Sequence, residues 1–472
     1  MFLLAWISLG MQVDVLIGSR GLLPIAEHLA DARRQGTSFF EFPTPFWIVA
    51  GDRAVTWGIA GGGLLALAAM LGKRPRLCLF LSSALYLGYA TACRNFLGFQ
   101  WDNLLIECGV LATLLPEDRP ARWAHVLLRL LLFKVYFESG VSKWLSHLGD
   151  WRDGSAMALY YETAPLPTPL AHLAHALPAG WHRVESWATL VFELAVPWCV
   201  FGTRRMRLFA LAAMTAFQAA IFLSANYGFF CPLMIILGAL LLDEGDAVRW
   251  MARIRRRQRP AEDRAARRPG RLEEMARRML TTMFVTLWVW ISFTEGMAYF
   301  DRAPEKNWDA AARGLRPFYE PWRVANTYHL FGHVTRERVE PEFQTTLDGK
   351  TWTAQALRFK PGEPKRSPPW VAPHQPRVDF QLWFHGLAFR RGMPVYAAAL
   401  LDRLCVAPDA IASLFAEPPP KAPQAVRIAY WRYRFTTPPE RRKSGAWWSR
   451  EWVRATPQVA CSDRAVLRQR AR

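Results

Sequence analysis

Long apolar runs alternate with short polar segments through the first 243 residues, and one more apolar run follows at 279–300. A helix that spans a bilayer needs about 20 mostly apolar residues. Nine runs approach that length: 2–17, 54–71, 77–92, 102–115, 122–145, 187–201, 206–224, 229–242 and 279–300. Because several are short, we predict an α-helical polytopic membrane bundle of about eight to nine spans. The first run lacks a basic start and a small-residue cleavage site, so it reads as an anchor.

Beyond residue 300 the pattern changes to short segments punctuated by proline. The segment "FQTTLDGKTWTAQALRFKPG" has strand-forming residues on both sides of Asp348-Gly349, which predicts a hairpin. Alternation in "VRIAYWRYRF" at 426–435 predicts another strand, and helical pieces are expected over 377–389, 394–404 and 408–415. The pattern predicts a small α+β soluble domain with an antiparallel sheet.

These patterns divide the chain into five parts. We expect a transmembrane bundle at 1–243 with an interfacial loop at 146–186, then a basic cytoplasmic loop at 244–278. A last transmembrane helix at 279–300 leads to an exported domain at 301–455 and a basic tail at 456–472. Total hydropathy conceals this division, because 52% apolar residues and a mean hydropathy of +0.02 average two unlike halves.

The formal charge of +20 is unevenly placed and predicts an orientation. Alternate loops at 72–77, 116–124, 202–207 and 243–278 contain 20 Lys and Arg, whereas those at 18–53, 93–101, 146–186 and 225–228 contain 7. Basic loops stay in the cytoplasm, so the N-terminus is expected there and everything after residue 300 on the opposite, exported side. The loop "RIRRRQRPAEDRAARRPGR" is expected to orient the spans and bind anionic lipid headgroups, not nucleic acid.

Charged groups within the apolar runs are costly and mark candidate functional sites. Glu107, Lys134, Glu138 and Glu193, with Gln218, fall in four different runs. Glu107, Glu138, Glu193 and Gln218 each lie roughly 8–11 Å from the predicted exported end of their spans. Lys134 and Glu138 share a helix face and can pair, while Arg129 and Lys143 can reach the interfaces. The layer predicts either a buried packing network or an intramembrane acid–base site.

The spacing of the histidines and cysteines does not predict a metal site or a set of disulfides. His172, His175 and His182 lie in the interfacial loop without a recognised metal-ligand spacing, so we expect no metal and no cofactor. The seven cysteines are far apart, without a C-x-x-C pair, and five lie in apolar runs. That spacing predicts no disulfide framework.

The last 52 residues contain 13 Lys and Arg against 3 acids, interleaved with tryptophans. This surface suits an anionic membrane, an acidic or amphipathic protein client, or a plain solvated strand face, and the exported location disfavours nucleic acid.

An ordered set of segments resembles one family. "WDNLLIECGVL", "LLLFKVYFESGVSKWLS", "YYETAPLPTPLAHLAHALP" and "SANYGFF" are followed by "DGKTW", "PPWVAPHQPRVDFQLWF" and "GAWWSRE". Together they resemble the lipase maturation factor family over about residues 1–455. The resemblance implies a polytopic membrane protein whose exported region contacts lipases, in the endoplasmic reticulum membrane for eukaryotic members. The composition suits a bacterial protein in the inner membrane with a periplasmic C-terminal domain.

We therefore expect a non-enzymatic, membrane-anchored maturation factor for exported lipase-like proteins. The residues expected to bind the client are His374, Gln375, Arg377, Asp379, Trp383, Trp431, Trp447 and Trp448. The first alternative is an integral-membrane enzyme that uses the polar layer of Glu107, Lys134, Glu138 and Glu193 for acid–base chemistry. The membrane half also distantly resembles the multi-helix region of vitamin K-dependent carboxylases, although no catalytic residue of that family maps onto this chain. The second is a scaffold that only binds lipid headgroups. Client identity and oligomeric state stay open.

Overall fold

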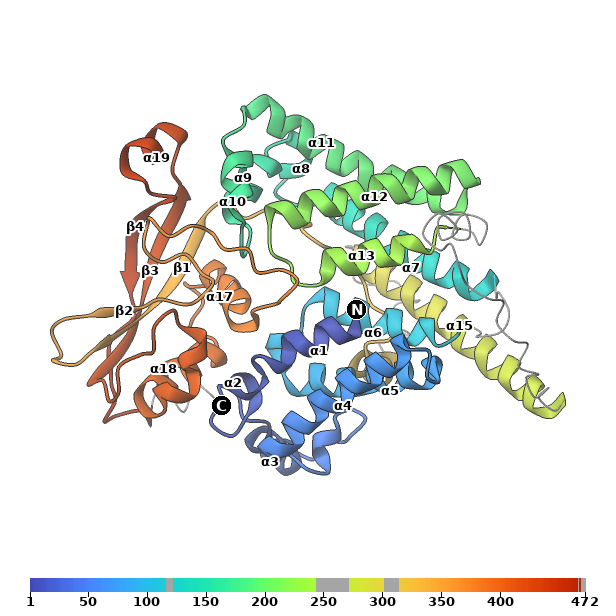
Figure 1. Cartoon of the computed structure of the whole chain (residues 1–472), viewed down its shortest axis with the longest axis horizontal. Helices are drawn as coiled ribbons and strands as arrows, with labels where there is room; N and C mark the ends of the chain where they lie inside the picture. The colour runs from blue at the N-terminus through green and yellow to red at the C-terminus, as the bar shows by residue number, and fades with distance from the viewer. Residues whose placement is uncertain (116–121, 243–270, 301–313, 466, 468–472) are drawn as a thin grey trace.

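The computed structural model describes residues 1–115, 122–242, 271–300, 314–465 and 467. A mostly helical region comes first, and a smaller sheet-containing region follows beside it (Figure 1). Most of the predicted basic loop at 244–278 and part of the tail at 456–472 lie outside the described residues. The C-terminal region begins, as far as it is described, at residue 314.

The first region consists of helices that follow the predicted apolar runs. The longer helices are α4 (Asp52–Met70), α5 (Pro75–Ala92), α6 (Gln100–Ala112), α7 (Arg122–Trp144), α11 (Ala179–Ala195), α12 (Arg204–Ser224) and α15 (Arg271–Phe300). Within the described residues, three helical stretches are long and apolar enough to cross a membrane: α4, α12 and Ala179–Phe201, which joins α11 to the 3₁₀ helix η3 (Val196–Phe201). The expected eight to nine spans are not confirmed.

Three predicted runs are divided or shortened in the structure. The run at 2–17 is broken into α1 (Phe2–Gly10) and α2 (Val13–Ile17), and the run at 229–242 gives only the ten-residue α13 (Phe230–Ala239). The run at 102–115 ends at Ala112. At 1.5 Å per residue, ten or thirteen residues are too short to span about 30 Å alone.

Short helices fill the connections on one side of the bundle. These are α3 (Ile25–Arg34), η1 (Pro45–Trp47), η2 (Arg94–Leu97), α8 (Asp150–Asp153), α9 (Ala156–Thr163) and α10 (Pro169–His175). The loop at 146–186 is therefore folded rather than extended. Pro169 begins α10, where its missing N–H costs nothing.

The C-terminal region confirms the predicted antiparallel sheet. Strands β1 (Arg338–Thr346), β2 (Thr353–Gln355), β3 (Ala425–Phe435) and β4 (Trp448–Ala455) pair antiparallel in the order β2-β1-β3-β4, and β5 (Val459–Ala460) pairs with β3. Gly349, at φ +71°, turns the chain between β1 and β2 as the Asp-Gly signal predicts. Helices α17 (Arg377–Leu387) and α18 (Val395–Val406) lie between the sheet and the bundle (Figure 1). The remaining helices are η4 (Glu320–Trp322), η5 (Pro408–Leu414) and α19 (Pro438–Ser444).

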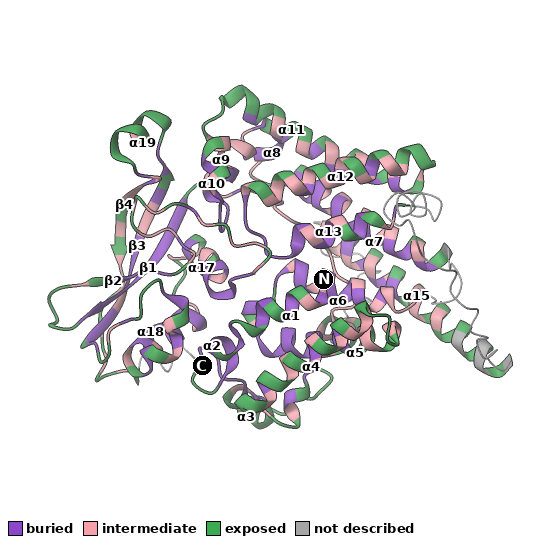
Figure 2. Ribbon diagram, in the orientation of Figure 1, coloured by how far each residue is buried: buried purple, intermediate pink, exposed green. Residues whose placement is uncertain are grey.

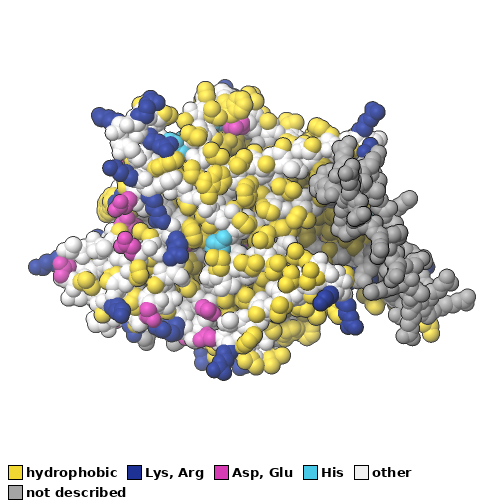
Figure 3. Space-filling model, viewed as in Figure 1, with side chains coloured by type: hydrophobic (Ala, Val, Ile, Leu, Met, Phe, Trp, Pro, Cys, Tyr) yellow, Lys and Arg dark blue, Asp and Glu magenta, His cyan; other side chains and the backbone are white. Residues whose placement is uncertain are grey.

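Buried residues run without interruption from the helices into the sheet region (Figure 2). Apolar side chains cover much of the helical surface in the view of Figure 3, whereas charged side chains gather over the sheet end. The helical surface therefore suits a lipid environment and the sheet end suits water.

Candidate functional site

A buried ion pair joins the two regions. Arg377 begins α17, and its guanidinium donates two hydrogen bonds to Asp102 of α6, at 2.5 and 2.8 Å. Both side chains are fully buried, and the Tyr86 hydroxyl donates to the same carboxylate at 2.7 Å. Bidentate geometry and a third hydrogen bond compensate for removing both charges from water. The sequence pattern gave no partner for Arg377.

Backbone groups around Arg377 are also held by the helical region. The Gln12 side chain accepts from the Arg377 amide at 2.8 Å and donates to the Gln375 carbonyl at 2.7 Å. Asn226 accepts from the amides of Val371 and Ala372, at 2.8 and 2.9 Å. These contacts fix the segment 371–377 against the bundle.

Further contacts involve the loops that contain few basic residues. Arg338 donates to the carbonyls of Glu162 and Ala164 in the loop 146–186. Arg20, in the loop 18–53, forms an exposed pair with Asp409. The C-terminal region therefore packs on the side of the bundle that the charge count assigns to the exported face.

The eight expected client-binding residues occupy different environments. Arg377, Asp379, Gln375 and Trp448 are buried, and His374 is half-buried with Nδ1 3.0 Å from the Ser8 hydroxyl. Burial raises the pKa of Asp379 to about 6, and burial together with Arg377 lowers that of His374 to about 4. In this structure the buried members hold the fold together and present no surface to a client.

The aromatic members lie nearer the surface. Trp383 is partly exposed and donates to the Thr163 carbonyl at 2.8 Å. Trp447 is partly exposed beneath the Arg441 guanidinium, 3.4 Å from the ring centroid. Trp431 is partly exposed on β3.

Tryptophan and arginine lie together on the face of the sheet opposite α17. Tyr430 hydrogen-bonds His385 of α17 at 3.0 Å, so the neighbouring Trp431 points to the opposite face. Arg450 lies over the Trp431 ring at 4.4 Å, and the exposed Trp452 is the cross-strand partner of Trp431. Glu342 accepts from Trp431 at 3.1 Å and from Arg450 at 2.9 Å. We call Trp431, Arg450 and Trp452 the outer sheet patch.

The polar groups expected within the membrane form two separate clusters rather than one layer. Glu107 accepts from Trp288 at 3.0 Å, Asn326 at 2.8 Å and Tyr328 at 2.6 Å. Lys134 approaches Glu107 to 3.8 Å and donates to Ser292 at 3.0 Å, in place of the expected pairing with Glu138.

Glu138 instead accepts the Tyr328 amide at 2.7 Å. Two of the partners in this cluster, Asn326 and Tyr328, come from the segment after α15. The cluster therefore also joins the C-terminal region to the bundle.

The second cluster lies between α7 and α11. Glu193 pairs with Lys143 at 2.7 Å, and both are buried, so the expectation that Lys143 reaches the interface is wrong. Lys143 also donates to the Leu330 carbonyl at 2.8 Å. Gln218 donates to the Tyr136 hydroxyl at 2.9 Å and does not contact either charged cluster.

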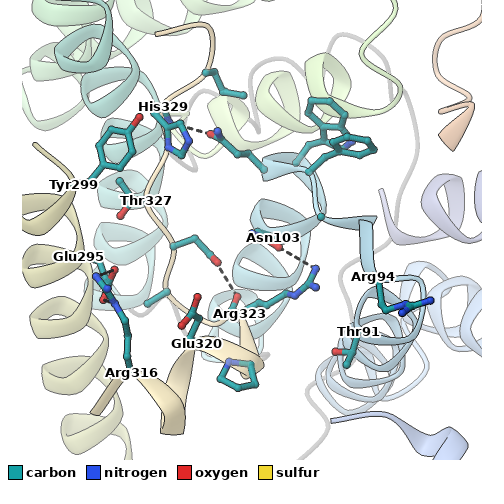
Figure 4. Close-up of a pocket in the computed structure, with 18 of the residues that line it drawn as sticks. Thr91, Arg94, Asn103, Glu295, Tyr299, Arg316, Glu320, Arg323, Thr327 and His329 are labelled. Carbon is teal, nitrogen blue, oxygen red and sulfur yellow. Dashed lines mark hydrogen bonds and ion pairs between the residues drawn. The ribbon is translucent and has the colours of Figure 1, made fainter. Parts of the chain in front are cut away.

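Two other features bear on chemistry. Cys405 at the end of α18 and Cys461 after β5 form a disulfide, which the spacing did not predict because sequence alone does not reveal pairing. Within the described residues, no group of three His, Cys, Asp or Glu side chains is arranged to hold a metal ion. A cavity of about 1030 Å³ opens between the two regions, near the ends of α5, α6, α7 and α15 (Figure 4).

The fold and these contacts define an integral membrane protein whose polar C-terminal region is docked on its helical bundle. A family model described as "Lipase maturation factor transmembrane domain" matches residues 1–249, and one described as "Lipase maturation factor C-terminal domain" matches residues 324–457. The chain belongs to the lipase maturation factor family.

Similar proteins match nearly the whole chain. Lipase maturation factor 2 from Gallus gallus is 28% identical, covering 98% of this chain and 80% of the relative. Lipase maturation factor 2 from Homo sapiens is 28% identical, covering 99% and 82%, and lipase maturation factor 1 from Bos taurus is 27% identical, covering 93% and 83%. No solved structure matches this chain.

Proposed function

We propose that this protein is a membrane-anchored factor that assists the maturation of exported lipases, holding its client on the outer sheet patch. The relatives' names support a role in lipase maturation, and both family regions are present in the expected order. The helical region anchors the protein, and the C-terminal region works beside the membrane.

Two observations support an exported C-terminal region, which is periplasmic if the protein is in a bacterial inner membrane. The C-terminal region contacts three of the weakly basic loops: Arg20 and Gly21 in 18–53, Leu97 in 93–101 and Glu162 in 146–186. The second observation is the disulfide Cys405–Cys461, which links α18 to the residue after β5. Disulfides persist in oxidising compartments, which lie on the exported side of the membrane.

The main support for the outer sheet patch as the client surface is the exposed side chain of Trp452. Trp452 is 58% exposed, although a large aromatic side chain on a strand would be expected to pack against a neighbour. Glu342 and the ring of Trp431 hold Arg450 in place, so the patch presents aromatic and cationic surface without rearrangement. Such preorganised aromatic and Arg groups are enriched at protein interfaces.

Secretion of an active lipase tests this assignment. The full chain, Trp452→Ala, and the control Trp370→Ala are each produced with an exported lipase in cells from which the native gene is deleted. Trp370 is 50% exposed and does not belong to a strand, so its replacement matches the loss of exposed aromatic area.

We expect Trp452→Ala to reduce the amount of active exported lipase at least several-fold, while Trp370→Ala matches the parent. Unchanged lipase activity with Trp452→Ala, at equal protein level, would overturn the assignment of the patch. Unchanged activity after deletion of the whole gene would overturn the maturation role itself.

The enzymatic alternative stays a prediction that no specific observation favours. Glu107, Lys134, Glu138 and Glu193 do not line the cavity between the two regions, and Glu107 already accepts three hydrogen bonds.

A further inference from the structure

The cavity between the two regions lies where four helices end on one side of the bundle. Thr91 belongs to the last turns of α5, Trp101 and Asn103 to the first turn of α6, Ser142 to the end of α7, and Tyr299 to the end of α15. The ends of α5, α6 and α7 adjoin the weakly basic loops 93–101 and 146–186, and α15 ends just before the C-terminal region. The charge count therefore assigns the cavity to the exported membrane interface.

One wall of the cavity is aromatic. Phe99 stacks on Trp101 with ring centroids 4.9 Å apart and meets Phe380 edge-on at the same distance, while Phe384 stacks on Phe99 at 6.1 Å. All four residues line the cavity. This wall offers a surface for apolar groups.

Three residues that line the cavity, including Trp101 of the aromatic wall, have buried polar atoms without hydrogen-bond partners among the described residues. The Thr91 hydroxyl, the Trp101 indole N–H and His329 Nδ1 are buried atoms with no partner within the described protein. Thr91 and Trp101 are 8% and 4% exposed. A buried polar group without a partner costs about 1–3 kcal/mol, and three such atoms belong to residues that line this one cavity.

Residues with a left-handed backbone conformation also line this cavity. Arg94, Arg323 and Phe331 line the cavity and have φ of +47°, +51° and +53°. Among the described residues five non-glycine residues have positive φ, so three of the five meet here. Such conformations cost of order 1–3 kcal/mol each and cluster at ligand sites.

The charges around the cavity are balanced. Arg316 donates to both carboxylate oxygens of Glu295, at 2.8 and 2.9 Å, as Figure 4 shows. Arg94 and Arg323, against Glu41 and Glu320, bring the lining to three charges of each sign. A ligand with both a phosphate and an ammonium group fits this environment better than one with a net negative charge.

Exposed aromatic side chains lie next to the lining residues. Phe40 is 69% exposed beside the lining residue Glu41, and Phe318 is 74% exposed between the lining residues Pro317 and Tyr319. Aromatic side chains at this level of a membrane protein sit among lipid headgroups. Exposed aromatic side chains of this kind are therefore next to the cavity lining in the chain.

We propose that the cavity binds one zwitterionic phospholipid of the exported leaflet. The indole N–H of Trp101 and the hydroxyl of Thr91 donate to phosphate or ester oxygens, and the start of an acyl chain lies on the aromatic wall. The proposal does not depend on the client or on the outer sheet patch.

Native mass spectrometry of the full chain provides the first test. The protein is incubated with phosphatidylethanolamine or phosphatidylglycerol in detergent, and retained lipid is counted after gentle delipidation. The variant Thr91→Val/Trp101→Phe removes both donors and keeps an aromatic ring at position 101. Thr335→Val is the control, because its hydroxyl also lacks a partner but does not line the cavity.

We expect the parent and Thr335→Val to retain one phosphatidylethanolamine, and the double variant to bind it about tenfold more weakly. Equal retention by the double variant, a preference for phosphatidylglycerol, or no retention by the parent would each overturn the proposal.

A second measurement uses the unaltered chain, so it does not depend on the variants folding. A phospholipid with a photoreactive headgroup should crosslink to residues 91–103 and 323–333. Crosslinks spread evenly over the bundle, or an exported polypeptide crosslinked there in place of lipid, would overturn the proposal.

Discussion

Replacing Arg377 by Met tests whether the buried ion pair joins the two regions. The variant removes a guanidinium that makes two bonds to Asp102 and leaves that carboxylate fully buried with Tyr86 as its remaining side-chain partner. Breaking a buried pair in this way costs about 3–5 kcal/mol. We expect that loss in the free energy of unfolding, measured by tryptophan fluorescence in mixed micelles.

Two further variants separate the effect of charge from that of packing. Arg377→Met/Asp102→Asn removes the stranded charge, so it should recover at least about 2 kcal/mol of the loss, as coupled neighbours do. Arg20→Met breaks an ion pair at the same interface, but Arg20 and Asp409 are 63% and 60% exposed. Exposed pairs contribute about 0–1 kcal/mol, so this control should unfold almost like the parent.

A loss below about 1 kcal/mol for Arg377→Met, or no recovery in the double variant, would refute this reasoning. Docking itself is followed by a short crosslinker between cysteines placed at 20 and 409. Arg377→Met should lower the crosslinking yield in native conditions if the pair holds the regions together.

Three further predictions concern other buried groups. Asp379 has a folded pKa of about 6, above its unfolded value of 3.8, so its contribution to stability falls by roughly 3 kcal/mol as the pH rises from about 4 to 6. The variant Asp379→Asn still accepts the Phe359 amide and should lose this pH dependence when unfolding is compared at pH 4.5 and 7. The same pH dependence in the variant and the parent would contradict the assignment. Cys405→Ala opens a disulfide between residues 56 apart, so chain entropy predicts a loss of about 4 kcal/mol in the free energy of unfolding of the C-terminal domain. Chemical unfolding of the variant is compared with that of the parent, with and without reductant. A parent whose unfolding does not respond to reductant would count against the bridge. Lys143→Met should destabilise the bundle by about 3–5 kcal/mol, because it leaves Glu193 buried without its partner. Adding Glu193→Gln should restore most of this loss in the same micelle assay, and no restoration would show that the pair is not coupled.

Local patterns in the sequence predicted local structure well. The hairpin at Asp348-Gly349, the strand at 426–435 and the helix at 377–389 all depend on residues close in the chain, and the structure places β1–β2, β3 and α17 there. The family was also evident from ordered segments. The span count was less secure, because a broken apolar run such as α1–α2 looks continuous when only composition is read.

Partners of charged groups were predicted poorly. A helix face suggested Glu138 for Lys134, yet Glu107 of another helix lies nearer, and Lys143 found Glu193 rather than the interface. Asp102 is the first residue of the run 102–115 and was not among the expected polar sites, and nothing local indicated Arg377 as its partner. Its partner is 275 residues away in the chain.

By itself, the sequence determined which segments are apolar, which loops contain the arginines and where the short strands form, because these follow from hydropathy, charge and local backbone preference. The tertiary structure alone decided that Arg377 faces Asp102, that Cys405 meets Cys461, and that unpartnered polar atoms gather around one cavity. Those outcomes depend on how distant elements pack, and a buried charge takes whichever partner that packing brings within reach.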